Sequence, residues 1–310
     1  MRLFGAFLKL VRLPNLFFIA LTQALFQICI FQTLYKGTIP ANDILHFIFL
    51  SLASLMIAAA RYIINDYFDI NIDEVNKPGR MVVDKVMHRR WAIAWHFMLN
   101  SAGLVLTILA LPFLQKWYLV LANMLCMALL WFYSTNFKKQ LLIGNIVISL
   151  LTAWTILIIF FSKVNLEDAF GAGTTSHHKF FRIAVLYAGF AFIISLIRES
   201  IKDMEDMPGD SRYGCRTMPV VWGVNATKVY TAVWLIVLIG MVIVVMIYIL
   251  QFRWWLPVTY CILAIILPLL VVLVKLRNSS TPIQFRQLSI ITKLIMFTGI
   301  VSMIFFYFNL

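Results

Sequence analysis

Acidic residues gather in two short windows of an otherwise apolar chain. Ten of the thirteen Asp and Glu residues lie within residues 66–84 or 199–210. In the first window Asn65, Asp69 and Asp73 are four residues apart, so they share one face if the segment is helical. Carboxylates stacked on one face repel each other, and beside an apolar run they are costly unless something positive compensates them. The first window therefore predicts a site for a cation.

The second window repeats this pattern at a different spacing. Asp203, Asp206 and Asp210 stand at positions i, i+3 and i+7, which again lie on one helical face. Pro208 and Gly209 interrupt the segment, and we expect them to end the helix and leave Asp210 on the following turn. Two distant parts of the chain thus each supply a row of carboxylates.

The ligand types in these windows favour a hard cation. They are oxygen donors with no Cys or His close by in the sequence, as Mg²⁺ prefers. Mg²⁺ takes one or two protein carboxylates and fills its other positions with water and substrate phosphates. Two carboxylate clusters flanking a gap would suit a Mg²⁺-bridged diphosphate, with nearby Lys and Arg binding the remaining negative charge. The alternative is a set of interface ion pairs with Arg61, Lys77, Arg80, Arg198 and Lys202.

Composition places these clusters in a membrane protein. The 310 residues are 62% hydrophobic and only 13% charged, and several apolar runs reach the ~20 residues that a helix needs to cross a bilayer. These runs do not alternate, which argues against a barrel. We predict an all-α membrane protein in which nine transmembrane helices surround a central cavity, as a single domain over residues 1–310. The expected spans are 14–35, 43–68, 92–112, 116–135, 143–162, 181–203, 227–250, 254–275 and 287–308.

Lysine and arginine predict the orientation. With the N-terminus in the cytoplasm, 20 of the 26 Lys and Arg residues fall on the inner side. We therefore expect a cell (inner) membrane protein with a cytoplasmic N-terminus and an external C-terminus. Both acidic windows then lie in cytoplasmic loops and helix ends after the second and sixth helices, where they can face each other. The net charge of +13 concentrates on this side, which suits anionic lipid, an anionic substrate, or both.

The chemistry follows from these features together. The acids hold a metal ion, the metal holds a diphosphate, and the apolar helices hold the chain attached to it. A long apolar chain that bears a diphosphate is a prenyl diphosphate. We therefore expect the substrate to be of this class, and the reaction to ionise its carbon–oxygen bond in a site that excludes water.

Four stretches of the sequence resemble one known family. Residues 65–73, followed by the NKPGR of residues 76–80, resemble the first signature of the UbiA-type intramembrane prenyltransferases, and residues 203–210 resemble the second. The stretch YSTNFKKQLLIGN at 133–145 is similar to the third, and VRLPN at 11–15 is similar to the start of the first helix. The resemblance covers nearly the whole chain and implies a prenyltransferase with Mg²⁺ as its cofactor.

One branch of that family is the most similar. The stretches at 198–220 and 138–149 look most like the branch that makes digeranylgeranylglyceryl phosphate, which joins a geranylgeranyl group to geranylgeranylglyceryl phosphate. Many relatives continue after the position of Arg80 with a proline and soon a Ser-Gly pair, whereas this chain has MVVDK at 81–85. That departure leaves an aromatic acceptor, such as 4-hydroxybenzoate, homogentisate or a naphthoate, as the alternative. A membrane transporter and a non-catalytic scaffold are alternatives of other classes.

The resemblance also implies roles for individual residues. Asp69, Asp73, Asp203 and Tyr133 would be catalytic, with the Tyr133 ring near the allylic cation. The metal ligands would be Asn65, Asp69, Asp73, Asp203, Asp206 and Asp210. The residues expected to contact the diphosphate are Lys77, Arg80, Lys138 and Lys202, and those expected to contact the acceptor are Arg12, Asn15, Arg198 and Arg216. The expected partners are a prenyl diphosphate, a lipophilic acceptor and the bilayer, with no nucleic acid and no obligate protein partner.

Overall fold

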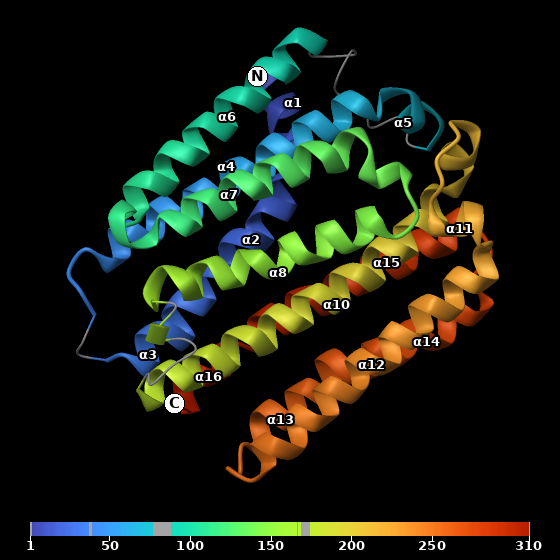
Figure 1. Ribbon diagram of the computed structural model, residues 1–310. Coiled ribbons are helices and arrows are strands. Elements are labelled where there is room, and N and C mark those ends of the chain that lie inside the picture. Colours follow the sequence, from blue (N-terminus) through green and yellow to red (C-terminus); the bar gives the residue numbers. More distant parts are fainter. Residues whose placement is uncertain (1, 37–38, 77–87, 166, 169–173, 310) are drawn as a thin grey trace. The chain divides into compact units, whose positions relative to one another are not determined.

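The computed structural model describes residues 2–36, 39–76, 88–165, 167–168 and 174–309 (Figure 1). All regular elements in these ranges are helices, which confirms the predicted all-α class. Nine helices of the described chain are long and apolar enough to cross a membrane. Their bounds are Leu13–Leu34, Asp43–Phe68, Arg89–Ala110, Gln115–Thr135, Ile143–Lys163, Thr175–Arg212, Val224–Leu250, Trp255–Asn278 and Pro282–Asn309.

Several of these spans contain more than one labelled element. In chain order the helices are α1 (Arg2–Leu10), α2 (Leu13–Leu25), η1 (Phe26–Phe31), α3 (Gln32–Leu34), α4 (Asp43–Phe68), α5 (Ile70–Asn76), α6 (Arg89–Ala110), α7 (Phe113–Thr135), η2 (Phe137–Lys139), α8 (Ile143–Lys163), α10 (Thr175–Arg212), α11 (Met218–Val221), α12 (Val224–Leu250), α13 (Trp255–Cys261), η3 (Ile262–Ile266), α14 (Leu267–Asn278), α15 (Pro282–Val301) and α16 (Ile304–Asn309). Each predicted span matches one observed span to within a few residues, apart from the two ends of α10.

The chain divides into two compact units. Unit 1 consists of Met1–Lys138 and Trp154–Val185, and unit 2 of Lys139–Ala153 and Leu186–Leu310. Helices α8 and α10 each begin in one unit and end in the other. The expectation of a single domain stays a prediction.

Unit 1 is built around α4, which packs along α6 and α7 (Figure 1). The contact between α4 and α6 is close because Gly103 stands in it. A Cβ at Gly103 would lie 3.0 Å from Ile57 Cγ1 and 3.3 Å from the Ala53 carbonyl oxygen. A small residue of this kind lets two membrane helices approach more closely than larger side chains allow.

The start of α4, at the opposite end from Asp69, carries a buried polar cluster. One carboxylate oxygen of Asp43 accepts a hydrogen bond from Lys163 Nζ at 2.6 Å, and the other accepts one from Gln27 Nε2 at 2.7 Å. Lys116 is also buried, and its ammonium donates to the carbonyls of Phe161 and Ser162 at 2.9 and 2.7 Å. A buried charge requires partners of this kind. The cluster therefore joins the helices of unit 1 at that end.

A proline within one span of unit 2 is accommodated by a local change of helix type. Pro268 stands near the start of α14, directly after the π-helical segment η3. Because proline has no N–H, the Ala264 carbonyl lacks its ordinary helical donor. The hydroxyl of Thr298, on α15, donates to this carbonyl at 2.8 Å. π-bulges are among the usual sites of kinks in helices.

The prediction that Pro208 and Gly209 end the sixth span is wrong. Helix α10 continues through Pro208 to Arg212, so Asp210 lies in the helix and not on a turn. Proline removes only one backbone donor, and that loss is tolerated in some helices. The helix ends instead at Arg212, before Gly214, whose φ of +69° suits glycine, and the Cys215 N–H donates to the Asp210 carbonyl at 2.9 Å.

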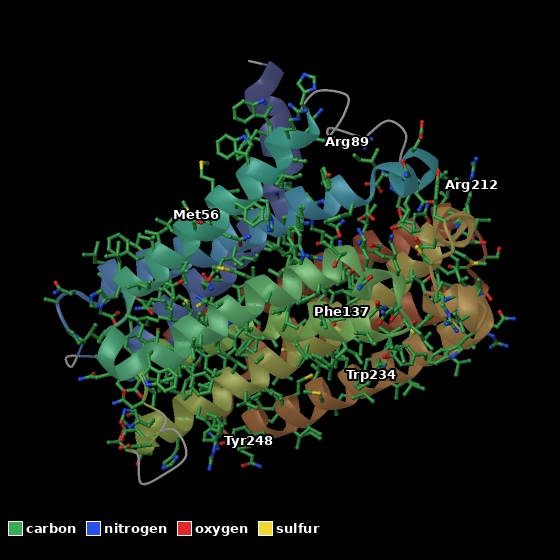
Figure 2. The ribbon with its side chains drawn as sticks, turned by 45° about the horizontal axis from the view of Figure 1, so that its top comes forward. Met56, Arg89, Phe137, Arg212, Trp234 and Tyr248 are labelled. Carbon is green, nitrogen blue, oxygen red and sulfur yellow. The ribbon has the colours of Figure 1, made fainter. Side chains whose placement is uncertain are left out.

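Large apolar side chains cover the outside of the spans. Val244 and Trp255 are each 67% exposed, and Leu256 is 72% exposed. Trp234 and Tyr248 stand at different levels along α12 (Figure 2). Exposure of this kind would be a liability in water, but it is what a helix presents to lipid.

Candidate functional site

The first acidic segment is nearly a continuous helix. Helix α4 ends at Phe68, Asp69 follows with φ of −93° and ψ of 3°, and α5 begins at Ile70. Backbone hydrogen bonds continue across this junction. The Asp69 N–H donates to the Asn65 carbonyl, and the Asp73 N–H donates to the Asp69 carbonyl. Each of these bonds joins residues four apart, as in an α-helix. The helical hydrogen-bond pattern therefore continues through Asn65, Asp69 and Asp73, as predicted.

Both carboxylate oxygens of Asp69 are engaged. Asn65 Nδ2 donates to Oδ2 at 2.6 Å, and Lys138 Nζ lies 2.5 Å from Oδ1. The Asp69 side chain is 16% exposed and that of Lys138 is 10% exposed, so water screens this ion pair weakly. The structure thus brings together three residues that the sequence assigned to the site, from two segments about seventy positions apart.

Arg12 is paired with an acidic residue in this structure. Its guanidinium lies 2.7 Å from Asp66 Oδ1, although we predicted that Arg12 contacts the acceptor. Burial works to lower the pKa of Arg12, but Asp66, Tyr62 and Asp73 together outweigh it and raise that pKa above its ordinary value. The guanidinium therefore stays charged. Arg12 has a left-handed backbone, with φ of 52°, and the N–H of Asn15 donates to its carbonyl at 2.7 Å.

Two arginine guanidinium groups contact two tyrosine rings near this segment. The guanidinium carbon of Arg12 lies 5.2 Å from the centroid of the Tyr62 ring. The guanidinium carbon of Arg61 lies 5.2 Å from the same ring and 5.0 Å from the ring of Tyr133. These distances are those of cation–π interactions. Tyr133, which we assigned to the site from its motif, thus carries a cation on its ring in this structure.

In the second acidic segment, the Asp203 carboxylate accepts a hydrogen bond from a side-chain amide. Asn145 Nδ2, from the start of α8, donates to Asp203 Oδ2 at 2.8 Å. Asn145 is only 9% exposed, so its amide is held in place against this carboxylate. The arrangement repeats the pairing of Asn65 with Asp69, because in each case an asparagine donates to the first aspartate of its cluster.

The cations expected near Asp203 are bound to a glutamate. Arg198 Nη1 lies 2.9 Å from Glu199 Oε1, and Lys202 Nζ lies 3.6 Å from Glu199 Oε2. We predicted Lys202 as a diphosphate contact and Arg198 as an acceptor contact. Glu199 neutralises part of their charge, and each would have to release it in order to bind an anion.

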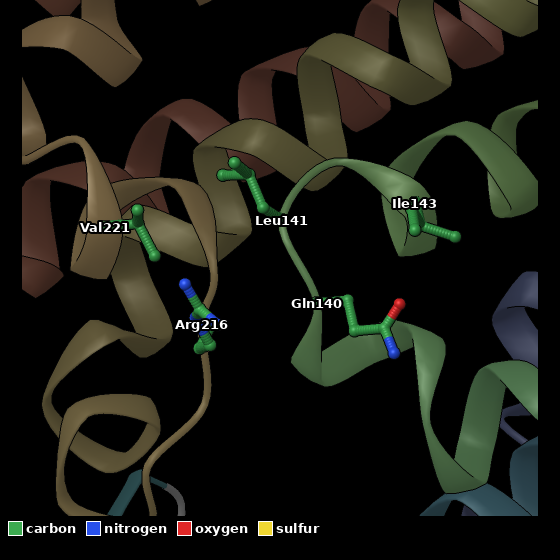
Figure 3. Close-up of a pocket in the computed structure, with 5 residues that line it drawn as sticks. All are labelled: Gln140, Leu141, Ile143, Arg216 and Val221. Atoms are coloured by element: carbon green, nitrogen blue, oxygen red, sulfur yellow. The ribbon is translucent and has the colours of Figure 1, made fainter.

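The end of the second segment is held by local bonds. The Thr217 hydroxyl donates to Asp210 Oδ2 at 3.2 Å, and the Arg216 N–H donates to the Lys139 carbonyl at 2.8 Å. Gln140, Leu141, Ile143, Arg216 and Val221 line an open pocket of about 200 Å³ (Figure 3). The exposed Arg216 side chain brings a positive charge to this pocket.

Not every predicted site residue can be placed. Lys77 and Arg80 lie outside the described residues. Asp73 and Asp206 are partly exposed and have interactions with other groups. Sequence reasoning assigned no role to Asp66 or Asn145, and it named Arg61 only as a possible ion-pair partner. Asn145 stood within a motif, but nothing in the spacing indicated that it would reach Asp203, 58 positions away.

The chemistry of the donor set suits Mg²⁺. The asparagine–aspartate pairs offer only carboxylate and amide oxygens, which are the ligands that this ion prefers. Within the described residues, no three His, Cys, Asp or Glu side chains gather closely enough to hold a metal ion. Mg²⁺ commonly binds through one or two carboxylates together with substrate phosphates, so these residues fit such a site.

Comparison with known proteins identifies the family of this chain. A model of the UbiA prenyltransferase family matches residues 24–299. A digeranylgeranylglyceryl phosphate synthase from Methanospirillum hungatei is 32% identical over 223 residues, which are 72% of this chain and 70% of that protein.

Solved structures share the fold. One, from work on digeranylgeranylglyceryl phosphate synthase in membranes, matches 98% of this chain and 99% of its own with a TM-score of 0.63 and 20% identity. A UbiA homologue from Archaeoglobus fulgidus bound to GPP and Mg²⁺ matches 96% of this chain and 99% of its own, with a TM-score of 0.58 and 14% identity. At these identities the likeness shows the fold alone.

Proposed function

Because the chain belongs to the UbiA prenyltransferase family, we propose that it transfers a geranylgeranyl group from geranylgeranyl diphosphate to geranylgeranylglyceryl phosphate. The choice of acceptor is supported by the 32% identity to a digeranylgeranylglyceryl phosphate synthase. The observation that carries the site is the carboxylate of Asp69, which is held by Asn65 and Lys138 at an end of a membrane-spanning helix.

The proposed reaction exchanges one carbon–oxygen bond for another. The bond between C1 of the donor and its diphosphate breaks, and diphosphate leaves with the electron pair. The free hydroxyl of the acceptor then forms a new bond to C1 and loses its proton, which the leaving diphosphate can accept. The allylic cation reacts with water, so the site must exclude it. The apolar helices around the site suit that requirement.

We propose Mg²⁺ as the cofactor, as the ion bound with GPP in the homologue from Archaeoglobus fulgidus suggests. When bound, Mg²⁺ would neutralise charge on the diphosphate as it leaves. The residues proposed to hold it are Asn65, Asp69, Asp73, Asp203, Asp206 and Asp210. The amides of Asn65 and Asn145 orient the carboxylates of Asp69 and Asp203 by hydrogen bonds, and such partners tune a metal site.

Lys138 is proposed to have two roles in the site. In this structure it neutralises Asp69. An ammonium on a flexible stem can turn from a carboxylate to a phosphate oxygen, so Lys138 can contact the diphosphate once Asp69 has another cation. The Tyr133 ring bears the guanidinium of Arg61. Its electron-rich π system would also attract an allylic cation.

The chain is a membrane protein, and we propose that its N-terminus is cytoplasmic. The distribution of Lys and Arg supports this orientation. The acidic segments would then open to the compartment that supplies soluble Mg²⁺ and receives diphosphate.

The test is an assay of purified protein with Mg²⁺ and geranylgeranyl diphosphate in two tubes. One tube contains geranylgeranylglyceryl phosphate and the other contains 4-hydroxybenzoate, and mass spectrometry identifies the products. We expect the diether phosphate in the first tube only. A prenylated aromatic compound would overturn the proposed acceptor. If neither product forms and no diphosphate is released, the proposed reaction is wrong and transport of an unchanged substrate becomes the better explanation.

A further inference from the structure

Arg61 is a charged residue within a membrane-spanning segment. It lies on α4, eight residues before Asp69, so its Cα is about 12 Å along the helix axis from that of Asp69, toward the interior of the span. Arginine at such a position is costly unless it has a partner, and ionisable residues there often mark a functional site. Arg61 therefore requires an explanation.

The surrounding cations have acidic partners, but Arg61 has none among the described residues. Arg12 is bound to Asp66, and Lys138 is bound to Asp69. Arg61 donates no hydrogen bond and forms no ion pair in the described chain, and its buried Nε lacks an acceptor. Its guanidinium instead contacts the rings of Tyr62 and Tyr133. Ring faces stabilise the charge, but they leave the N–H groups of the guanidinium without acceptors.

We propose that Arg61 binds the anionic headgroup of the acceptor, which in the proposed function is the phosphate of geranylgeranylglyceryl phosphate. This inference rests on that function. The rings of Tyr62 and Tyr133 lie 5.2 and 5.0 Å from the guanidinium carbon and restrict its movement, and its fork of N–H groups suits two phosphate oxygens. A bound anion would supply the acceptors that the buried Nε lacks.

The acceptor is a better ligand for Arg61 than the diphosphate is. The diphosphate is proposed to bind at Asp69, two helical turns away along α4. An unneutralised guanidinium on the interior side of that position would also repel the allylic cation. A phosphate on the acceptor removes this repulsion, and it holds the acceptor hydroxyl close to the reacting carbon.

The test measures lipid binding by R61Q and R61K, with R286Q as the control because Arg286 is an exposed arginine on α15. Protein in nanodiscs is titrated with geranylgeranylglyceryl phosphate, with uncharged geranylgeranylglycerol, and with a non-ionising thiolodiphosphate analogue of the donor. We expect R61Q to weaken binding of the phosphate lipid about 10- to 100-fold, and to leave the other two ligands within about twofold. R61K keeps the charge but loses the fork, so its loss should be smaller. R286Q should bind like the wild type.

Three results would overturn the role of Arg61: unchanged binding of the phosphate lipid to R61Q, an equal loss for all three ligands, or a loss for the donor analogue alone. A separate measurement of prenyl transfer shows whether the role of Arg61 or the proposed function is wrong. A wild-type enzyme that transfers the prenyl group while R61Q binds the acceptor normally refutes only the Arg61 assignment. A wild-type protein that binds the phosphate lipid through Arg61 but transfers nothing refutes only the proposed function. If the wild-type protein does not bind the phosphate lipid, both are wrong.

Discussion

The ammonium of Lys138 lies 2.5 Å from Oδ1 of Asp69, so a cation from the protein occupies the carboxylate that we assign to Mg²⁺. The two residues are 69 positions apart in the sequence. An acidic residue held in this way is neutralised without metal, which lowers the cost of keeping it beside hydrocarbon. Binding of Mg²⁺ to this carboxylate would compete with Lys138.

This competition predicts the effect of the Lys138→Met substitution. Without the ammonium, Asp69 should bind Mg²⁺ more readily, so the Mg²⁺ concentration for half-maximal activity should fall. The maximal rate should also fall, by roughly 10- to 100-fold, because the diphosphate loses a charged contact. Titration of activity with Mg²⁺ measures both quantities. The neighbouring Lys139 is exposed, so Lys139→Met is the matched control and should resemble the wild type. A higher Mg²⁺ requirement in Lys138→Met would contradict the competition.

The amide of Asn145 is predicted to orient Asp203. Replacing Asn145 by alanine removes the donor 2.8 Å from Oδ2, and we expect kcat/KM to fall roughly 10- to 100-fold, as for other residues that orient a metal ligand. Steady-state kinetics at several Mg²⁺ concentrations provide the measurement. Asn136→Ala, at an exposed asparagine, controls for loss of an amide elsewhere. Wild-type kinetics in Asn145→Ala would mean that the hydrogen bond has no part in catalysis.

The Thr298 hydroxyl is predicted to stabilise the segment around Pro268. Thr298→Val leaves the Ala264 carbonyl without this donor, which should reduce stability by about 1–3 kcal/mol. Thermal melting in detergent compares it with Thr292→Val, whose hydroxyl bonds only within its own helix. Adding Pro268→Ala restores a backbone N–H, so the cost of Thr298→Val should shrink in that background. Equal costs in both backgrounds would show that the proline is not the reason for the contact.

The buried pair of Lys163 and Asp43 gives a prediction about stability apart from catalysis. Lys163→Met leaves Asp43 buried without its ammonium and should destabilise the protein by about 3–5 kcal/mol. The double variant with Asp43→Asn removes the unpaired charge and should recover much of this loss. Melting temperatures of the two variants test the expectation. A double variant no more stable than Lys163→Met would indicate that the charges are not coupled.

The sequence predicted the membrane helices well because their signal is local. An apolar run of about twenty residues is sufficient to identify a span, and all nine expected spans match helices of the described chain. The ends were harder to predict. Pro208 was expected to stop α10, but the helix continues to Arg212 because its end depends on Gly214 and on the bond from Cys215 to Asp210.

The sequence indicated which residue types the candidate site contains but not how they pair. The four-residue spacing of Asn65, Asp69 and Asp73 predicted that they share one helical face. Backbone hydrogen bonds of the helical type join these three residues in the structure. Partners distant in the sequence leave no such pattern. The bond of Arg12 to Asp66 spans 54 positions, and the contact of Arg12 with the acceptor stays a prediction. That the two acidic segments face each other remains a prediction.

The most direct test of the account is Mg²⁺-dependent release of diphosphate by the wild type and Asp69→Asn. Glu74→Gln is the control, because Glu74 is an exposed acid in the same window. We predict that Asp69→Asn, while still folded and extracted from membranes like the wild type, releases diphosphate at least roughly 100-fold more slowly. Glu74→Gln should keep wild-type activity. Mg²⁺-dependent release at the wild-type rate by folded Asp69→Asn would contradict the assignment of Asp69 as a metal ligand, and with it the proposed site.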